Sequence, residues 1–241
     1  MMADRPHSPG DERLIRPELV LRVLARVLRL LIAPFVRLEI RGGACATRLE
    51  TAVIVANHRS MGDAIIGLVV LHHFGHYPRV LIAREFVEAR WTGVFARAGG
   101  SIPVDRGGDP VAALDPAVET LAAGPPILVM PEGRLHRDDD PNTTGPAKTG
   151  VARLAARSEM PVVVAALSGT AEVWPPDRRL PVLNPFRRRV VLCHVADEEF
   201  FVEGADPRAD TEHVMSELRV LLRQANEERA AITGPAAGRR R

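Results

Sequence analysis

Residues 51–63 read TAVIVANHRSMGD, an apolar run followed by an asparagine, a histidine and, five positions after the histidine, an aspartate. The run Thr51 to Ala56 predicts a buried strand, so His58 and Asp63 should lie just beyond a strand end. An imidazole there can act as a general base near neutral pH, and a carboxylate on its far nitrogen fixes the tautomer and stabilises the imidazolium. The stretch predicts a catalytic dyad; alternatively, Asp63 only caps the next helix and His58 only ends the strand.

The two side chains of this dyad meet only if the chain turns between them. Five residues along a regular helix would rotate His58 and Asp63 well apart around the axis. Ser60 and Asp63 have capping-box spacing, which predicts a helix beginning near Met61, and Gly62 leaves room for another group. The sequence therefore allows the turn that the dyad needs.

Two later segments also show an apolar strand that ends in charge and glycine. They read GSIPVDR at 100–106 and ILVMPEGR at 127–134. If the strands run parallel, their charged ends share one rim with His58, where open α/β sheets bind ligands. Arg106 offers a planar fork to a phosphate, and Gly133 permits close approach of a polar ligand. Taken alone, each segment also fits an ordinary turn.

Apolar runs alternate with helical segments along most of the chain. This alternation predicts an α/β fold: one layered domain with a largely parallel or mixed central sheet flanked by helices. With 46% hydrophobic residues among 241, the chain can bury one core, and we predict a single domain over 36–229. The predicted strands are about 36–40, 51–56, 79–83, 101–104, 126–130, 161–167 and 189–195. The predicted helices are about 61–74, 84–98, 110–123, 148–157 and 208–229.

The segment before the domain, 16–35, predicts an amphipathic helix. Arg22, Arg26 and Arg29 share one narrow face of it, and its unbroken apolar stretches are far shorter than the roughly 20 residues that cross a bilayer. This pattern suits a helix that lies in a membrane interface; alternatively, the helix packs on its own domain. We expect flexible segments at 1–15, which lacks a signal peptide's apolar core, and at 230–241, a basic tail.

The amino-acid composition argues against several kinds of site and partner. The cysteines are Cys45 and Cys193 alone, without metal-type spacing, so neither a disulfide framework nor a zinc site is predicted, and a reducing compartment fits. An aromatic content of 4% and the absence of a recognisable binding fold in the sequence argue against a nucleic-acid partner. His72, His73 and His76 look like a metal cluster, but adjacent histidines on a helix point apart. We therefore expect neither a metal nor another cofactor.

Lys148 is the only lysine of the chain. It lies in PAKTGV at 146–151, a basic and glycine-containing helix start where an ammonium can face a phosphate. The alternative is an ordinary exposed lysine.

Four segments resemble, in order and spacing, the four sequence blocks of the glycerolipid acyltransferase family typified by 1-acylglycerol-3-phosphate acyltransferases. They are Asn57–Asp63, Gly100–Arg106, Pro131–Gly133 and Met160–Thr170. The resemblance, which covers about 36–170, implies that His58 and Asp63 are catalytic. It also implies that the acceptor phosphate is bound by Arg106 with Glu132 and Gly133, and it places a basic helix start such as that of Lys148 after the third block.

The resemblance implies transfer of a fatty acyl group from acyl-CoA or acyl carrier protein to the hydroxyl of lysophosphatidate. Such an enzyme needs no cofactor and works as a peripheral protein at the cytoplasmic face of the cell membrane. One departure concerns the third block, which in the family usually continues Glu-Gly-Thr-Arg-Ser but here reads Glu132-Gly133-Arg134-Leu135-His136. Arg134 would then be a second cation near the phosphate.

This departure leaves the acceptor open. Glycerol 3-phosphate, another lysolipid, or a lipid amine or alcohol are alternatives within the same chemistry. From a different class, a catalytically silent lipid-binding scaffold is the alternative, although the complete His58 and Asp63 pair disfavours it.

Overall fold

A computed structural model of the 241-residue chain describes residues 17–90, 92–105, 107 and 109–234. A seven-stranded sheet has the order β1-β7-β6-β2-β5-β3-β4, and all neighbouring strands are parallel except β6 and β7. The prediction of an α/β fold around a largely parallel, mixed sheet is confirmed. The strands are β1 (Val36–Gly42), β2 (Val53–Ala56), β3 (Arg79–Ala83), β4 (Ile102–Val104), β5 (Ile127–Val129), β6 (Val162–Ser168) and β7 (Arg189–Val195).

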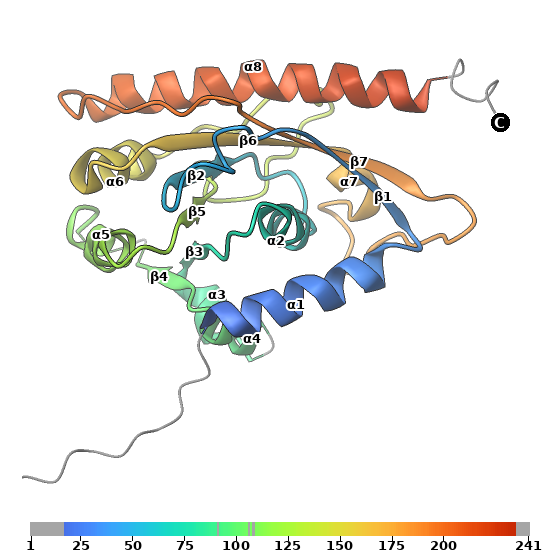
Figure 1. Cartoon of the computed structure of the whole chain (residues 1–241), viewed down its shortest axis with the longest axis horizontal. Helices are drawn as coiled ribbons and strands as arrows, with labels where there is room; N and C mark the ends of the chain where they lie inside the picture. Colours follow the sequence, from blue (N-terminus) through green and yellow to red (C-terminus); the bar gives the residue numbers. More distant parts are fainter. Residues whose placement is uncertain (1–16, 91, 106, 108, 235–241) are drawn as a thin grey trace, which may run out of the picture.

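Helices cover both faces of this sheet (Figure 1). α5, α6 and α8 pack on one face and α2 on the other, and α1 lies against α2 on the outside. The helices are α1 (Pro17–Ile32), α2 (Asp63–His73), α3 (Arg84–Glu88), α4 (Thr92–Ala98), α5 (Asp115–Ala122), α6 (Gly150–Ser158), α7 (Thr170–Val173) and α8 (Pro207–Thr233), with a 3₁₀ turn η1 (Ala112–Leu114) before α5.

The two central strands, β2 and β6, are buried along their whole length. In β2, Val53 and Val55 join the hydrophobic core under α6 and α8, whereas Ile54 and Ala56 join the core under α2. A parallel strand covered on both faces reads as an unbroken apolar run, because both alternating sets of side chains are inside. Burial on both faces stabilises β2, and His58 lies just beyond the carboxyl end of this strand.

The helix predicted over 84–98 is wrong in one respect, because the chain forms α3 and α4 there instead of one helix. They separate at Ala89, whose backbone is extended with φ −64° and ψ 141°. Gly93 lets the two helices meet closely, since a Cβ at this position would lie 2.1 Å from the Val87 carbonyl oxygen. Arg97 Nη1 donates to the same oxygen at 2.6 Å, so a free carbonyl at the end of α3 is satisfied from α4.

The structure also differs from the predictions at α7 and at the last helix. α7 directly follows β6 and has no counterpart among the predicted helices. The last helix begins at Pro207 and continues past Arg229 to Thr233. The side chain of Asp206, just before the helix, accepts from the N–H groups of Arg208 and Ala209. Of the segments for which flexibility is predicted, 1–15 and 230–241, residues 1–15 and 235–241 lie outside the described residues, and residues 230–233 form the end of α8.

The predicted N-terminal helix is present as α1. Leu21 and Ala25 are buried, and α1 contacts α2, whereas the outer side of α1 exposes large apolar side chains: Leu19, Val23, Val27, Leu30 and Leu31. The Arg22 guanidinium lies 5.1 Å from the centroid of the Tyr77 ring. None of the described helices is long and apolar enough to cross a membrane.

Candidate active site

Asn57, directly after β2, anchors the turn that carries the predicted dyad. Its side-chain amide donates to the Leu167 carbonyl oxygen at 3.0 Å and accepts from the Leu167 N–H at 2.8 Å. The fully buried side chain thus continues the pairing of β2 with β6 by one residue. The pattern of the sequence does not single out Asn57, because its partner lies 110 residues away.

The structure brings the predicted dyad together. His58 Nδ1 lies 3.2 Å from Asp63 Oδ2, and Asp63 is fully buried whereas the His58 side chain is 22% exposed. The same carboxylate oxygen accepts from the backbone N–H groups of Arg59 and Ser60, each at 2.7 Å. Asp63 therefore closes a tight turn around one oxygen atom and orients the imidazole.

The capping box predicted from Ser60 and Asp63 is formed only in part. Asp63 reaches back to the Ser60 N–H, as predicted, but Ser60 Oγ accepts from the Gly62 N–H at 2.9 Å. The Ser60 hydroxyl donates to the Trp174 carbonyl oxygen at 2.8 Å. The helix consequently begins at Asp63 and not near Met61.

This arrangement allows His58 to accept a proton from a bound hydroxyl group. A proton on Nδ1 of His58 is held by the Asp63 carboxylate, which leaves Nε2 as the basic nitrogen. Nε2 has no hydrogen-bond partner among the described residues, and the ring is partly open to solvent. A hydroxyl placed against Nε2 can lose its proton to it while the carboxylate stabilises the resulting imidazolium.

Glu132 follows β5, the neighbour of β2, and lies next to the dyad. Its Oε1 accepts from the His58 backbone N–H at 3.4 Å, and the residue is 3% exposed. Burial raises the pKa of Glu132 to about 7, although the hydrogen bond from His58 and its charge oppose the shift. The second oxygen, Oε2, is buried without a hydrogen-bond partner among the described residues. Glu132 can therefore be neutral near physiological pH.

Gly133 and Lys148 lie side by side. Gly133 has φ +63°, and a Cβ on it would lie 3.6 Å from Lys148 Cε. The Lys148 N–H donates to the Pro131 carbonyl oxygen at 3.0 Å, which holds the start of α6 against the end of β5. Lys148 and Arg134 are both exposed, so two cations flank the turn that contains Glu132.

Arg106, the predicted phosphate ligand after β4, lies outside the described residues. Its strand ends on the same rim as β2, because β4 is parallel to β3 and β3 to β5. Two strands, β5 and β3, separate β4 from β2 in the sheet.

The loop 135–147, which follows the third block, is bonded to the dyad turn through Arg59. Arg59 Nη1 donates to the Thr143 carbonyl oxygen at 2.9 Å and Nη2 to that of Asp138 at 2.5 Å. The His136 N–H donates to the His58 carbonyl oxygen at 2.7 Å. Arg59 is therefore a second residue of the site that its sequence position did not mark.

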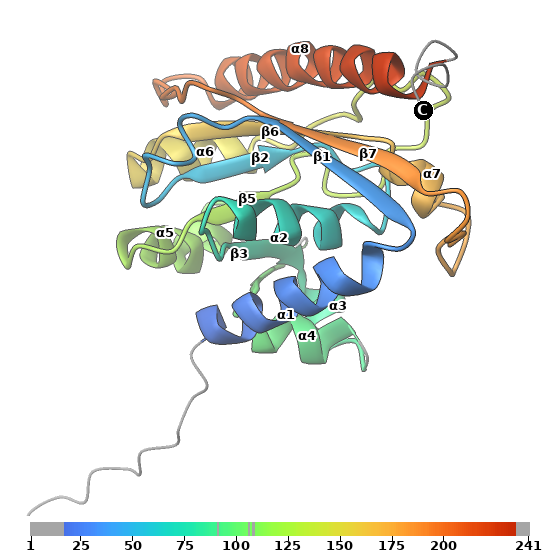
Figure 2. The same ribbon diagram turned by 45° about the vertical axis from the view of Figure 1, so that its right-hand side comes forward.

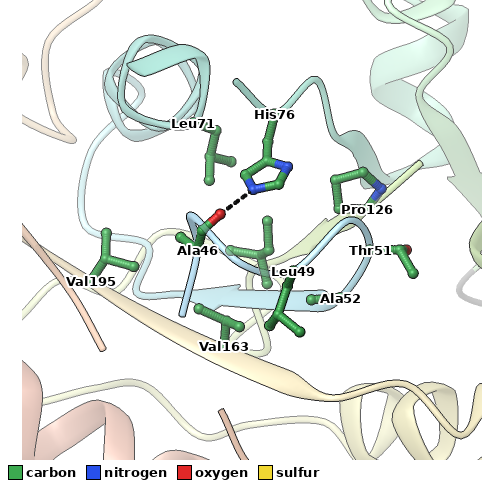
Figure 3. A pocket seen from close by; sticks show the side chains of 10 residues that line it. Ala46, Leu49, Thr51, Ala52, Leu71, His76, Pro126, Val163 and Val195 are labelled. Atoms are coloured by element: carbon green, nitrogen blue, oxygen red, sulfur yellow. Dashed lines mark hydrogen bonds between the residues drawn. The ribbon is translucent and has the colours of Figure 1, made fainter. Parts of the chain in front are cut away.

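The three histidines discounted as a metal cluster have different neighbours, and the His73 ring packs edge-on against the Phe74 ring with the centroids 5.2 Å apart. His72 Nδ1 lies 2.9 Å from the Tyr77 hydroxyl, and His76 Nε2 lies 2.5 Å from the Ala46 carbonyl oxygen. Figure 3 shows His76 at a small apolar pocket lined by Leu49, Leu71 and Val163. Its lining also includes Ala52 and Pro126, which precede β2 and β5, so the pocket lies at the amino ends of these strands. Within the described ranges, no group of three or more potential metal ligands is present.

Comparison with known proteins agrees with this fold. A family model described as acyltransferase matches residues 37–168, which is more than half of the chain. The chain therefore belongs to the acyltransferase family. The match ends at Ser168, the last residue of β6, and so includes both members of the dyad.

One solved structure is similar over most of its length: the 1-acyl-sn-glycerophosphate (LPA) acyltransferase PlsC from Thermotoga maritima. The TM-score is 0.66 at 18% sequence identity, and the match covers 88% of this chain and 83% of that one. At this identity the likeness shows a shared fold. Among curated proteins, none matches the chain significantly.

Proposed function

We propose that the protein transfers a fatty acyl group from the thioester of acyl-CoA or acyl carrier protein to the hydroxyl of lysophosphatidate. The observation that carries this proposal is the His58 Nδ1 to Asp63 Oδ2 distance of 3.2 Å, with the carboxylate fully buried beyond the end of a parallel strand. Membership of the acyltransferase family supports the reaction type. The lysophosphatidate acceptor is supported by the four sequence blocks and by the likeness to PlsC in fold.

The dyad acts on the acceptor hydroxyl. His58 Nε2 removes the hydroxyl proton as the oxygen attacks the thioester carbonyl, and Asp63 balances the charge of the imidazolium. When the tetrahedral intermediate collapses, the carbon–sulfur bond breaks and the thiolate takes the proton from His58. The products are a carboxylic ester and a free thiol, and no acyl-enzyme forms. Positioning both substrates beside His58 lowers the entropic part of the barrier.

Exposed cations beside Glu132, Lys148 and Arg134, bind the acceptor phosphate in this proposal. The resemblance to the family adds Arg106, which follows β4 in the sequence. Glu132 is compatible with an anionic ligand, because its pKa of about 7 allows the carboxyl to be neutral there. It also holds the His58 backbone, so it couples the phosphate site to the catalytic turn.

One observation leaves a second class of acceptor open. The third block has Arg134 where the family usually has threonine, and Arg134 is exposed. The same dyad can then acylate glycerol 3-phosphate, another lysolipid, or a lipid amine or alcohol.

The enzyme works at a membrane surface as a peripheral protein, at the cytoplasmic face. α1 exposes five large apolar side chains along its outer side, with Arg26 and Arg29 exposed beside them. Its other side packs on α2, so the two interpretations of this helix, membrane contact and packing on its own domain, are compatible. Arginines at the headgroups and leucines in the acyl boundary suit an interfacial helix.

The deciding experiment measures thiol release from acyl-CoA and acyl carrier protein with a panel of acceptors. Lysophosphatidate should support the fastest thiol release, with slower release for uncharged monoacylglycerol. Equal rates with both acceptors would favour the acceptor without phosphate. No thiol release with any acceptor would leave the lipid-binding scaffold.

A further inference from the structure

The loop between α7 and β7, residues 174–188, holds the most exposed large apolar side chain of the described chain. Phe186 is 97% exposed, Leu180 76% and Leu183 46%. We call this segment the apolar loop. Single exposed apolar residues are normal, but three on one short loop indicate a surface that is covered when the protein works.

Hydrogen bonds hold the apolar loop in shape. The Phe186 N–H donates to Asn184 Oδ1 at 2.9 Å, which forms a turn at the tip. The Val182 N–H donates to the Val173 carbonyl oxygen at 2.7 Å, and Trp174 Nε1 donates to that of Arg178 at 3.1 Å. Phe186 is therefore presented by a folded loop.

The apolar loop lies on the rim that carries the dyad. It follows β6, which is parallel to β2, and the Trp174 carbonyl oxygen at its base accepts from Ser60 in the dyad turn at 2.8 Å. At its other end, Arg188 Nη2 donates to the Val36 carbonyl oxygen at 2.9 Å, close to the end of α1. Figure 2 shows the loop beside the carboxyl end of α1, where Leu30 and Leu31 are exposed.

The charge of the apolar loop identifies its partner. Four exposed arginines and one aspartate lie within it: Arg178, Arg179, Arg187, Arg188 and Asp177. Each pair of arginines stands next to the apolar side chains in sequence. A cation layer around an apolar tip matches anionic headgroups over acyl chains. An acidic protein partner would match the arginines alone and would leave no reason for a nearly fully exposed Phe186.

We propose that the apolar loop is a second membrane-docking element, which inserts Leu180, Leu183 and Phe186 into an anionic bilayer beside the dyad. Together with α1 it turns the His58 rim toward the bilayer, so a lysophospholipid reaches the site without leaving the membrane. This role rests on the proposed function in that the acceptor is a membrane lipid.

The test uses the full chain and sedimentation with phosphatidylcholine vesicles that do or do not contain phosphatidylglycerol. Phe186→Ser with Leu180→Ser should lower partitioning to anionic vesicles by about tenfold or more. The matched control is Phe201→Ser, because Phe201 is 65% exposed and follows Phe200, which pairs with Val162 at the opposite rim. Unchanged sedimentation of the double variant, or an equal loss in the control, would overturn the proposal.

Charge reversal tests the arginines. Arg179→Glu with Arg187→Glu should weaken binding to anionic vesicles, and added salt should shrink the difference from the wild type. Arg208→Glu with Arg223→Glu on α8 is the control of equal charge, and it should have a much smaller effect. Unchanged vesicle binding together with a raised KM for acyl carrier protein would make the loop a carrier site and overturn the membrane role.

Rates of acyl transfer distinguish the membrane-docking proposal from the proposed function. Phe186→Ser with Leu180→Ser should slow transfer to vesicle-borne lysophosphatidate but leave the rate with a monomeric short-chain acceptor unchanged. If both rates fell equally while sedimentation stayed normal, the loop would act inside the site and the membrane role would be wrong. If the wild type transferred no acyl group but the variant still lost vesicle binding, the proposed function would fail and the docking loop would stand.

Discussion

Asp63 makes three contacts through one carboxylate oxygen: the His58 ring and the N–H groups of Arg59 and Ser60. Its other oxygen is buried without a hydrogen-bond partner among the described residues. The residue thus shapes the turn and supplies the negative charge. These two roles are separable, because an asparagine can place its oxygen where Oδ2 lies and its amide in the other position.

Asp63→Asn should therefore keep the fold but slow thiol release by about a hundredfold or more, because a neutral amide does not stabilise the imidazolium. Initial rates at saturating donor and acceptor measure the loss, and the melting temperature checks the fold. A folded variant with a near-normal rate would show that the charge of Asp63 is not used.

Glu132 should make stability depend on pH. Its pKa in the folded protein, about 7, is above the ordinary value of 4.5, so its contribution to stability is full below about pH 4.5 and is lost as the pH rises through about 7. Glu132→Gln stays neutral, so its free energy of unfolding relative to the wild type should increase by up to about 3 kcal/mol as the pH is raised. Urea unfolding at several pH values measures this, and a gap independent of pH would contradict it.

Residue patterns predicted only part of the site. His58, Asp63, Glu132 and Gly133 stand out because strand ends and short spacings are visible along the chain. Asn57 and Arg59 were missed because their partners, Leu167 and Thr143, are 110 and 84 residues away. Only the tertiary structure makes such contacts evident.

Among the secondary-structure elements, α1 packs on α2 with one side and exposes apolar side chains on the other. Arg26→Glu with Arg29→Glu should lower binding to anionic vesicles by about thirtyfold or more, since each cation near such a surface contributes about 1 kcal/mol and the new carboxylates are repelled by the lipid. Arg22 is best left intact because it lies over the Tyr77 ring. Sedimentation at low and high salt measures the effect, with Arg223→Glu on α8 as control. Equal binding of variant and wild type would assign α1 to the fold alone.

The loop 135–147 depends on Arg59 for two bonds to backbone carbonyls. Arg59→Ala should let this loop open more often, and its amides should exchange about tenfold faster, as expected for the loss of hydrogen bonds to a charged donor. Hydrogen exchange with mass spectrometry localises the change, and Arg223→Ala serves as the control. Unaltered exchange over 135–147 would mean that the other contacts of the loop are sufficient to hold it.

Most strands and the long helices follow from hydrophobic periodicity, because each buries a continuous face. The break between α3 and α4 was missed because it depends on the approach of Gly93 to Val87, a contact between helices. α7 was missed because four residues are too few to show a helical period.

For the whole molecule, strand order brings the site together. β2 lies between β5 and β6, so the ends of three strands place His58, Glu132 and Trp174 on one rim. The chain leaves β2 toward β3 and β4 and returns to β5 and β6 on either side, which makes β2 the switch point where such sheets bind ligands. Alternation of strands and helices indicated a largely parallel sheet, but the order and the antiparallel β7 depend on pairings between distant segments.

The central claim is that His58 removes the acceptor's proton. Its most direct test is the initial rate of thiol release from acyl-CoA with lysophosphatidate, for the wild type and for His58→Ala shown to be folded by circular dichroism. The account predicts a loss of about a hundredfold to ten-thousandfold for His58→Ala, the usual worth of general-base catalysis. A folded His58→Ala protein that releases thiol at a rate near that of the wild type would contradict it.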